Sequence, residues 1–381
     1  MSELNRLQEA GRWERRLKDK VEKILDLADI HIGGKRPWDI WVRDPRWYGR
    51  VLSGGSLALG ESFMDGWWDC GALDEFFKRI FLAGLDHYGE KGMGAHALRW
   101  AARLLNLQSP GRAFQVGIRH YDTGNELFEA MLDERMTYTC GYWGDAKTLE
   151  DAQEAKLEQA CRKLGLQRGQ RVLDIGCGWG SFMKYAAEKY HVQCVGITVS
   201  REQLELGRKL CGGLPVEFIL QDYRELTGRF DYVVSMGMFE HVGYRNYRAY
   251  MEKAHSCLKE GGLFLLSTMG SNRTGRHGYP WFDKYIFPNG MMPSIRQLGT
   301  AIEGLFVMED WSNFGPDYDK TLMAWFSNFE AGWESLSHLY DSRFYRMWKY
   351  YLLSLAGAFR ARKNQLWQVL LSKDPAGSRR A

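Results

Sequence analysis

The stretch from Val172 to Gly180, Val-Leu-Asp-Ile-Gly-Cys-Gly-Trp-Gly, constrains the fold more than any other part of the chain. Its first residues are apolar and mostly β-branched, which predicts a short buried strand over 171–175. The alternating glycines that follow let the backbone turn sharply and approach a ligand closely. A helix over 181–190 then presents its N-terminus to that ligand. The stretch therefore predicts the ligand-binding edge of an α/β sheet.

The spacing of these glycines argues against a dinucleotide. The pyrophosphate fingerprint G-x-G-x-x-G needs a third glycine that is missing at its expected place, so a single nucleoside is favoured. Asp174, just before Gly176 and Gly178, suits a cationic ligand better than a phosphate. Taken alone, the stretch also fits an ordinary strand, turn and helix of any α/β protein.

Alternating strand and helix patterns continue on the C-terminal side of the glycines. Helices are predicted over 149–164, 321–336 and 343–359. Further strands are predicted over 193–197, 216–220, 232–235, 263–268, 306–311 and 365–371. This alternation predicts a mainly parallel, doubly wound sheet, whose ligands bind at the carboxyl ends of its strands.

The carboxyl ends of these strands carry three pairs of polar side chains: Thr198 and Gln203, Asp222 and Tyr223, and Glu240 and His241. The first pair suits ribose hydroxyls in place of the usual acidic residue, and the second suits the edge and face of an adenine. The third pair places a carboxylate and an imidazole beside the reactive end of the cofactor. A purely structural role for the third pair, capping a helix, is the alternative.

The region before the glycines predicts a smaller, mainly helical domain over 1–115, followed by a catalytic domain over 116–381. Its predicted elements are helices over 12–30, 46–52, 73–83 and 96–107 and a strand over 40–42. The glycine- and aromatic-rich segment 54–68 is expected to be an irregular, packed loop without an assigned role. The helix over 96–107, with its apolar stripe and arginines, fits either a core helix or one lying on a membrane interface.

Composition narrows the function classes. A net charge of +4 without a long Lys/Arg run argues against nucleic acid as a partner. No apolar run approaches the ~18 residues of a membrane span and no signal-peptide pattern opens the chain, so a cytoplasmic protein is expected. Seven scattered cysteines predict neither disulfides nor a metal site. Aromatic residues make up 14% of the chain, which suits either a core or a pocket for a long apolar or transiently cationic substrate.

Five motifs carry a resemblance to a known family: residues 59–68, 120–125, 237–243, 284–290 and 313–315. Over about residues 50–372 the chain resembles the cyclopropane fatty acid synthases, within the seven-stranded class I methyltransferases of Rossmann-like fold. The resemblance implies transfer of a methylene group from S-adenosylmethionine to cis double bonds of phospholipid acyl chains. Mycolic acid cyclopropane synthases lack most of the region before residue 110, so this extension favours the phospholipid enzyme.

The resemblance also implies site residues. It places around S-adenosylmethionine the residues Tyr138, Thr139, Gly176, Gly178, Thr198, Val199 and Gln203, and around a bicarbonate ion Cys140, Glu240 and Tyr318. Where the family typically has a histidine in this bicarbonate site, the chain has Ser267. Ser267 itself, a water molecule or His277 from the long insertion over 272–293 are the alternatives there. An insertion of this length predicts a functional lid.

The implied chemistry needs such a site. An isolated alkene is a weak nucleophile, so it must be held close to the sulfonium methyl with water excluded. Methyl transfer leaves a carbocation, which aromatic faces stabilise and a base must deprotonate to close the ring. The resemblance implies that this base is the bound bicarbonate ion, oriented by Glu240 and Tyr318. The family further implies a homodimer that touches the inner membrane transiently. The alternatives are methyl transfer to another lipid or a small amine, and a catalytically silent lipid-binding homologue.

Overall fold

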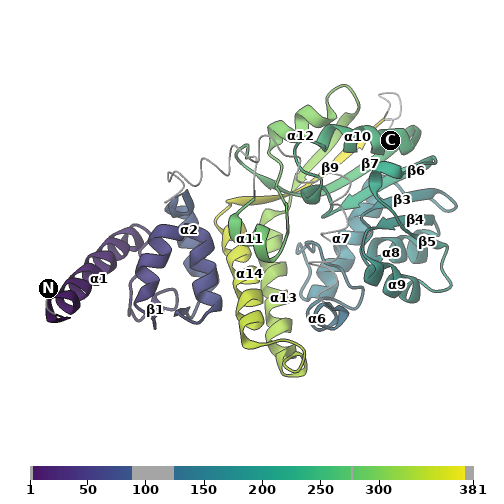
Figure 1. Ribbon diagram of the computed structural model, residues 1–381. Coiled ribbons are helices and arrows are strands. Elements are labelled where there is room, and N and C mark those ends of the chain that lie inside the picture. The colour runs from purple at the N-terminus through teal and green to yellow at the C-terminus, as the bar shows by residue number, and fades with distance from the viewer. Residues whose placement is uncertain (1–2, 88–123, 276–277, 374–381) are drawn as a thin grey trace.

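The computed structural model describes residues 3–87, 124–275 and 278–373, with the side chains of the first helix described from residue 13 onward (Figure 1). Four predicted features lie outside these ranges: the helix over 96–107, the domain boundary at 115, His277 and the loose tail after residue 373.

Seven strands of the described chain form one sheet, in the order β5-β4-β3-β6-β7-β9-β8. Their bounds are β3 (Arg171–Ile175), β4 (Gln193–Thr198), β5 (Val216–Leu220), β6 (Phe230–Met236), β7 (Leu258–Ser271), β8 (Val307–Asn313) and β9 (Asn364–Ser372). The strands from β5 to β7 run parallel, whereas β9 is antiparallel to both of its neighbours. The sheet confirms the predicted class I methyltransferase fold.

The register of the sheet brings the polar strand ends together. Strand β3 lies between β4 and β6, with Ile175 opposite Ile197 and Asp174 opposite Val234. Because parallel neighbours end at the same edge, the glycine turn after β3, Thr198 at the end of β4 and the segment after β6 share that edge. The predicted strands over 171–175 and 216–220 match their observed bounds, and the others differ at one or both ends, most of all the strand predicted over 263–268, which is β7 from Leu258 to Ser271.

Helices cover both faces of the sheet: α6 (Asn125–Met131), α7 (Leu149–Leu164), α8 (Ser181–Tyr190), α9 (Arg201–Leu210), α10 (Tyr247–Cys257), α11 (Pro280–Tyr285), α12 (Ile295–Ile302), α13 (Gly315–Leu336) and α14 (Ser342–Arg360). Helix α7 illustrates how capping residues in the sequence mark the start and end of a helix. Thr148 and Asp151 form a capping box at its start, and Gly165 ends it in the left-handed conformation.

The N-terminal elements are α1 (Glu3–Asp26), β1 (Ile40–Val42), α2 (Arg46–Met64), β2 (Trp68–Cys70), α3 (Leu73–Leu82) and the short helix η1 (Leu85–His87). The prediction of an irregular loop over 54–68 is wrong, because α2 continues to Met64. Only Gly55, with φ +56° and ψ −138°, interrupts it with a kink that glycine alone adopts easily. Helix α1 also begins earlier and ends earlier than predicted, before a turn in which Asp29 has φ +52°.

The N-terminal elements share a hydrophobic core with α13 and α14, which lie between them and the sheet in Figure 1. The Phe77 ring meets the Tyr350 ring edge-on at 5.1 Å. At the end of α14, the Arg360 guanidinium pairs with Asp74 and Glu75 of α3 and with Asp319 of α13. Aromatic packing and a shared cation therefore join α3 to the catalytic part.

Within the described ranges, none of the helices is both long enough and apolar enough to cross a membrane. The same residues contain no cluster of acidic, histidine or cysteine side chains suited to a metal ion. All seven cysteines are free and buried.

Candidate active site

A pocket of about 160 Å³ opens at the carboxyl ends of β3, β4 and β6. We call it the strand-end pocket. Ten of the residues that line it are those predicted to bind a nucleoside cofactor: Tyr138, Thr139, Asp174, Gly176, Gly178, Thr198, Val199, Gln203, Asp222 and Tyr223. The fold thus brings together residues spread over 86 positions of the sequence, from Tyr138 to Tyr223.

The glycine turn gives this pocket a bare backbone wall. Gly176 has φ +87°, and a Cβ atom there would lie 2.7 Å from Cβ of Met238. Gly178 has φ +54° and nothing within 4 Å of such an atom. A side chain at Gly176 would be both strained and blocked, whereas one at Gly178 would enter open space. The turn therefore leaves room for a ligand against the main chain.

The pocket wall after β4 is held by local hydrogen bonds. Thr198 Oγ1 donates to Gln203 Oε1 at 2.7 Å and accepts from the Ser200 backbone N–H at 3.1 Å. The Ser200 hydroxyl caps α9 by accepting from the Gln203 backbone N–H. These contacts orient Thr198 and Gln203 toward each other, and both side chains line the pocket.

A buried pair of opposite charges, Asp174 and Lys156, lines the same pocket. Burial raises the pKa of Asp174 to about 7, although the positive charge of Lys156 opposes this. Burial likewise lowers the pKa of Lys156 to about 8. Lys156 Nζ donates to Thr139 Oγ1 at 2.9 Å. The sequence prediction missed Lys156, although a lysine on the buried face of α7 was a usable signal, since lysine is seldom buried without a function or partner.

The third wall, after β5, contains Asp222 and Tyr223. The Asp222 carboxylate accepts from the Arg224 backbone N–H and pairs with the Arg224 guanidinium at 2.8 Å. The Tyr223 ring packs edge-on against Tyr250 at 5.0 Å. Asp222 is thus already held from one side, and part of the Tyr223 ring belongs to the core.

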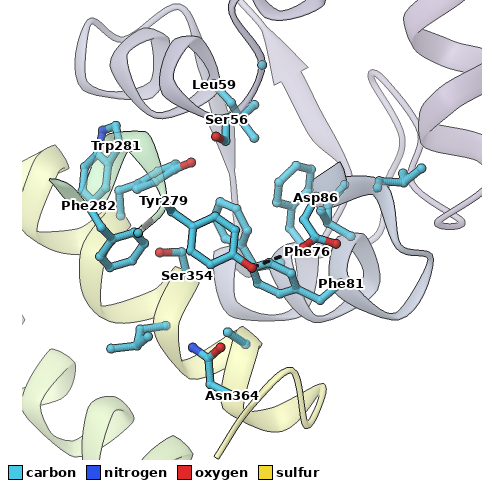
Figure 2. Close-up of a pocket in the computed structure, with 18 of the residues that line it drawn as sticks. Ser56, Leu59, Phe76, Phe81, Asp86, Tyr279, Trp281, Phe282, Ser354 and Asn364 are labelled. Carbon is cyan, nitrogen blue, oxygen red and sulfur yellow. Dashed lines mark hydrogen bonds between the residues drawn. The ribbon is translucent and has the colours of Figure 1, made fainter. Parts of the chain in front are cut away.

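A second and larger cavity, of about 380 Å³, lies between the N-terminal helices, α11 and α14 (Figure 2). We call it the apolar cavity. Most of its lining is aromatic or aliphatic, including Leu59, Phe76, Phe81, Trp281, Phe282 and Leu355. Its volume falls in the range of about 300–1,000 Å³ that is usual for small-molecule sites. The aromatic content of the chain is compatible with a pocket for an apolar substrate, but no sequence pattern predicts a cavity that joins α1, α2 and α3 to α14.

Few polar groups reach the apolar cavity. Figure 2 shows Tyr279 pointing across it toward Asp86, with its hydroxyl 3.3 Å from Asp86 Oδ2. Asp86 also pairs with Lys363 at 2.7 Å. Ser354 and Asn364 lie on the opposite wall.

The two cavities meet at His241, which lines both of them. Glu240 lines the apolar cavity beside it and is buried. Its Oε1 accepts from the Met269 backbone N–H at 2.5 Å, whereas its Oε2 has no hydrogen-bond partner among the described residues. Burial raises the pKa of Glu240 to about 7 and lowers that of His241 to about 4. At neutral pH the site therefore holds a neutral imidazole and a carboxyl group near its titration point.

The other three predicted catalytic residues line neither cavity. Cys140 is buried, with Sγ 3.9 Å from Thr321 Oγ1, and burial raises its pKa above the usual thiol range. Tyr318 packs its ring on Phe359 at 4.7 Å, one turn before Thr321 in α13. Ser267 is half-buried in β7, and its carbonyl oxygen accepts from the Gly237 backbone N–H at 3.0 Å. Cys140 thus contacts α13 one turn after Tyr318, and neither side chain lines the cavity wall beside Glu240.

Residues 108–369 match the family model described as mycolic acid cyclopropane synthetase, which covers more than half of the chain. The chain belongs to this family. Among curated family relatives, the cyclopropane-fatty-acyl-phospholipid synthase of Escherichia coli K12 is 52% identical over 353 residues, covering 93% of this chain and 92% of that protein. A probable fatty acid methyltransferase of Pseudomonas putida is 33% identical over 92% of this chain and 91% of its own length.

Solved structures of cyclopropane synthases show the same catalytic fold. The Mycobacterium tuberculosis enzyme MmaA2 superposes with a TM-score of 0.65 at 29% identity, covering 68% of this chain and 98% of its own. The mycolic acid cyclopropane synthase CmaA1, complexed with SAH and CTAB, gives a TM-score of 0.64 at 32% identity with the same coverage. These structures match about two thirds of the chain, whereas the Escherichia coli relative also matches most of its N-terminal part.

Proposed function

We propose that this chain is a cyclopropane synthase that uses S-adenosylmethionine to methylenate cis double bonds in the acyl chains of phospholipids. One observation carries the proposal: a polar nucleoside-type pocket and a long apolar cavity meet at His241, beside the buried carboxylate of Glu240. A reaction between a cofactor and a lipid chain needs such a junction, because the two reactants have opposite polarity.

S-adenosylmethionine fits the strand-end pocket on three grounds. The glycine turn leaves a bare backbone wall, the buried Asp174 suits a cationic ligand, and Thr198 with Gln203 suits ribose hydroxyls. When bound, this cofactor supplies an electrophilic methyl group on sulfur. The solved structure of CmaA1, a relative of this chain that is complexed with SAH, supports the assignment.

The apolar cavity suits an acyl chain. Its aromatic and aliphatic lining excludes water from the alkene, and Glu240 and His241 close its inner end. The Phe287 ring lies 5.6 Å from His241 and offers a face near a developing cation. Because its pKa is lowered, His241 stays neutral and does not repel that cation.

Glu240 is the proton acceptor in this proposal. After methyl transfer, loss of a proton from the new methyl group closes the three-membered ring, and Glu240 Oε2 is free to accept it. A bicarbonate ion fits at this carboxylate in part, since Oε2 has an open position for its hydroxyl. It would supply a second proton-accepting oxygen there. Cys140 and Tyr318, which the resemblance assigns to the same ion, do not line the cavity, and neither does Ser267, which replaces the histidine typical of the family.

The substrate lies in a bilayer, so we propose peripheral, transient contact with the inner face of the membrane by a cytoplasmic homodimer. Support comes from large apolar side chains exposed on the N-terminal elements. Trp13, Leu27 and Leu82 are each more than 60% exposed. These side chains belong to α1, the turn after it and α3, and both of these helices line the apolar cavity.

Incubation of the purified protein with S-adenosylmethionine and vesicles of cis-unsaturated phospholipid tests the function. Fatty acids recovered from the vesicles should gain one methylene each and contain the ring, as mass spectrometry and proton magnetic resonance will show. A methyl-branched product without a ring would point to a different lipid methyltransferase. Absence of any modified acyl chain would contradict the proposal.

A further inference from the structure

The lid segment, residues 279–292, joins two distant parts of the molecule. Its helix α11 packs on α2, and its second half reaches the active site. We propose that Gly60 and Glu61 of α2 are positioning residues for the reaction, acting on Glu240 through the lid segment. This inference rests on the proposed function, because it concerns the placement of the same proton acceptor.

The first contact is steric. Gly60 is buried, and a Cβ atom there would lie 2.3 Å from Cδ1 and 2.4 Å from Nε1 of the Trp281 indole. On its other side the same indole packs against the Tyr350 ring of α14, with centroids 4.5 Å apart. The missing side chain at residue 60 therefore sets how closely α11 approaches α2.

The second contact is polar. Glu61 Oε1 accepts from Lys284 Nζ at 2.6 Å and from the Tyr285 hydroxyl at 2.9 Å. Its Oε2 accepts from Arg50 at 3.1 Å, and the Glu61 side chain is only 17% exposed. Donors from both α2 and α11 thus fix one carboxylate. The motifs over 59–68 and 284–290, distant in sequence, interlock here.

Hydrogen bonds carry this position onward to the active site. Asn289 N–H donates to Asp283 Oδ1 at 2.7 Å, which ties the loop after α11 to the helix. Asn289 lines the strand-end pocket, and Met291 N–H donates to the Glu240 carbonyl oxygen at 2.8 Å. A shift of α11 will therefore move a wall of the cofactor site and the backbone of Glu240. A misplacement of about 1 Å in such a site costs up to ~100-fold in rate.

The test compares Gly60→Ala and Glu61→Gln with a matched control, Gly299→Ala. Gly299 lies in α12 and has nothing within 4 Å of an added Cβ atom. Both test variants should lower kcat roughly tenfold to a hundredfold. Calorimetry should find SAH affinity lowered by a smaller factor than kcat, because Asn289 is one residue among many that line the cofactor site. Part of their product should be a methyl-branched alcohol, formed when water adds its oxygen to the cationic carbon and releases a proton. The control should retain wild-type kcat and product.

A second change checks the steric step. Adding Trp281→Leu to Gly60→Ala removes the indole that the new methyl group strikes, so kcat should recover relative to Gly60→Ala alone. Glu61→Gln adds no volume and decides the question if Gly60→Ala fails to fold. Wild-type kcat and product in both test variants would overturn the inference. The inference would also be overturned if kcat fell only in proportion to the fraction of folded protein and the ratio of ring product to alcohol stayed as in the wild type. Wild-type protein assayed in parallel distinguishes this inference from the proposed function. If the wild-type protein itself forms no ring product, the proposed function is contradicted, and not the positioning role of Gly60 and Glu61.

Discussion

The strand-end pocket and the apolar cavity are built in opposite ways. The strand-end pocket takes most of its lining from turns that directly follow neighbouring strands of one sheet, so the register of β3, β4 and β6 fixes its shape. The apolar cavity takes its lining from Lys20 to Asn364, mostly from helices and from the lid segment, and only Met269 and Asn364 belong to strands of the sheet. Cofactor binding in this fold is thus set by local motifs, whereas substrate binding depends on how distant helices pack.

The two sites also differ in polarity, with one side chain in common. Buried charges, Asp174 and Lys156, lie in the strand-end pocket, and aromatic rings dominate the apolar cavity. His241 borders both. Substitutions in the strand-end pocket should therefore change cofactor affinity, and substitutions in the apolar cavity should change turnover or the KM for lipid.

The largest effect is expected from Gly176→Val. The positive φ and the 2.7 Å approach to Met238 oppose any side chain there, so the turn must distort. Calorimetry should find SAH affinity lowered by on the order of a hundredfold or more, with activity lost as well. Binding of a fluorescent cis-unsaturated fatty acid to the apolar cavity should persist. Unchanged SAH affinity would show that the glycine turn does not face the cofactor.

Glu240→Gln should lower turnover by about 10²- to 10⁴-fold, because the amide cannot accept the proton that ring closure releases. SAH affinity should stay near wild type, since Glu240 lines the apolar cavity and not the strand-end pocket. Single-turnover assays and calorimetry measure the two quantities. A collapse of SAH binding would mean that Glu240 serves the cofactor.

Ser354→Leu should raise the KM for vesicle phospholipid roughly tenfold, because the larger side chain fills part of the apolar cavity. The SAH affinity should not change. Ser335→Leu, at an exposed position of α13, is the matched control and should leave KM as it is. An equal KM for both variants would place the acyl chain elsewhere.

The raised pKa of Glu240 predicts a pH dependence with a definite sign. Turnover should rise as pH increases through about 7, because only the ionised carboxylate accepts a proton. The free energy of unfolding should fall over the same rise in pH. Ionising a buried carboxyl opposes folding between its unfolded pKa of about 4.5 and its folded pKa of about 7. Glu240→Gln should therefore melt a few degrees above wild type at about pH 8, and this difference should vanish near about pH 4. Calorimetric melting across that range measures it, and a constant difference would contradict the raised pKa.

The smallest effect is expected from Ser267→His, which restores the residue typical of the family. Ser267 lines neither cavity and holds Gly237 only through its backbone carbonyl, so activity should be equal or modestly higher. Initial rates with saturating S-adenosylmethionine measure the effect. A clear loss would show that this chain has rebuilt its active site around the serine.

Much of the strand-end pocket was predictable from sequence because its residues occupy positions that a parallel sheet defines. Thr198 ends one strand and Asp222 comes shortly after another, so alternation of strands and helices was enough to place them on one edge. Lys156 was missed because the sequence analysis predicted the extent of helix α7 and not which of its residues are buried. The segment 54–68 was mistaken for a loop because three of its four glycines lie inside α2, where they serve packing and one kink, and only Gly66 lies in a turn.

The sequence by itself determined the sheet, its ligand-binding edge and the class of cofactor, since strand periodicity and glycine conformations act over a few residues. Only the tertiary structure decided the apolar cavity, the contact of Gly60 with Trp281 and the junction at His241. These features join side chains separated by up to several hundred positions. Their geometry depends on how whole helices pack together, which no local pattern of residues specifies.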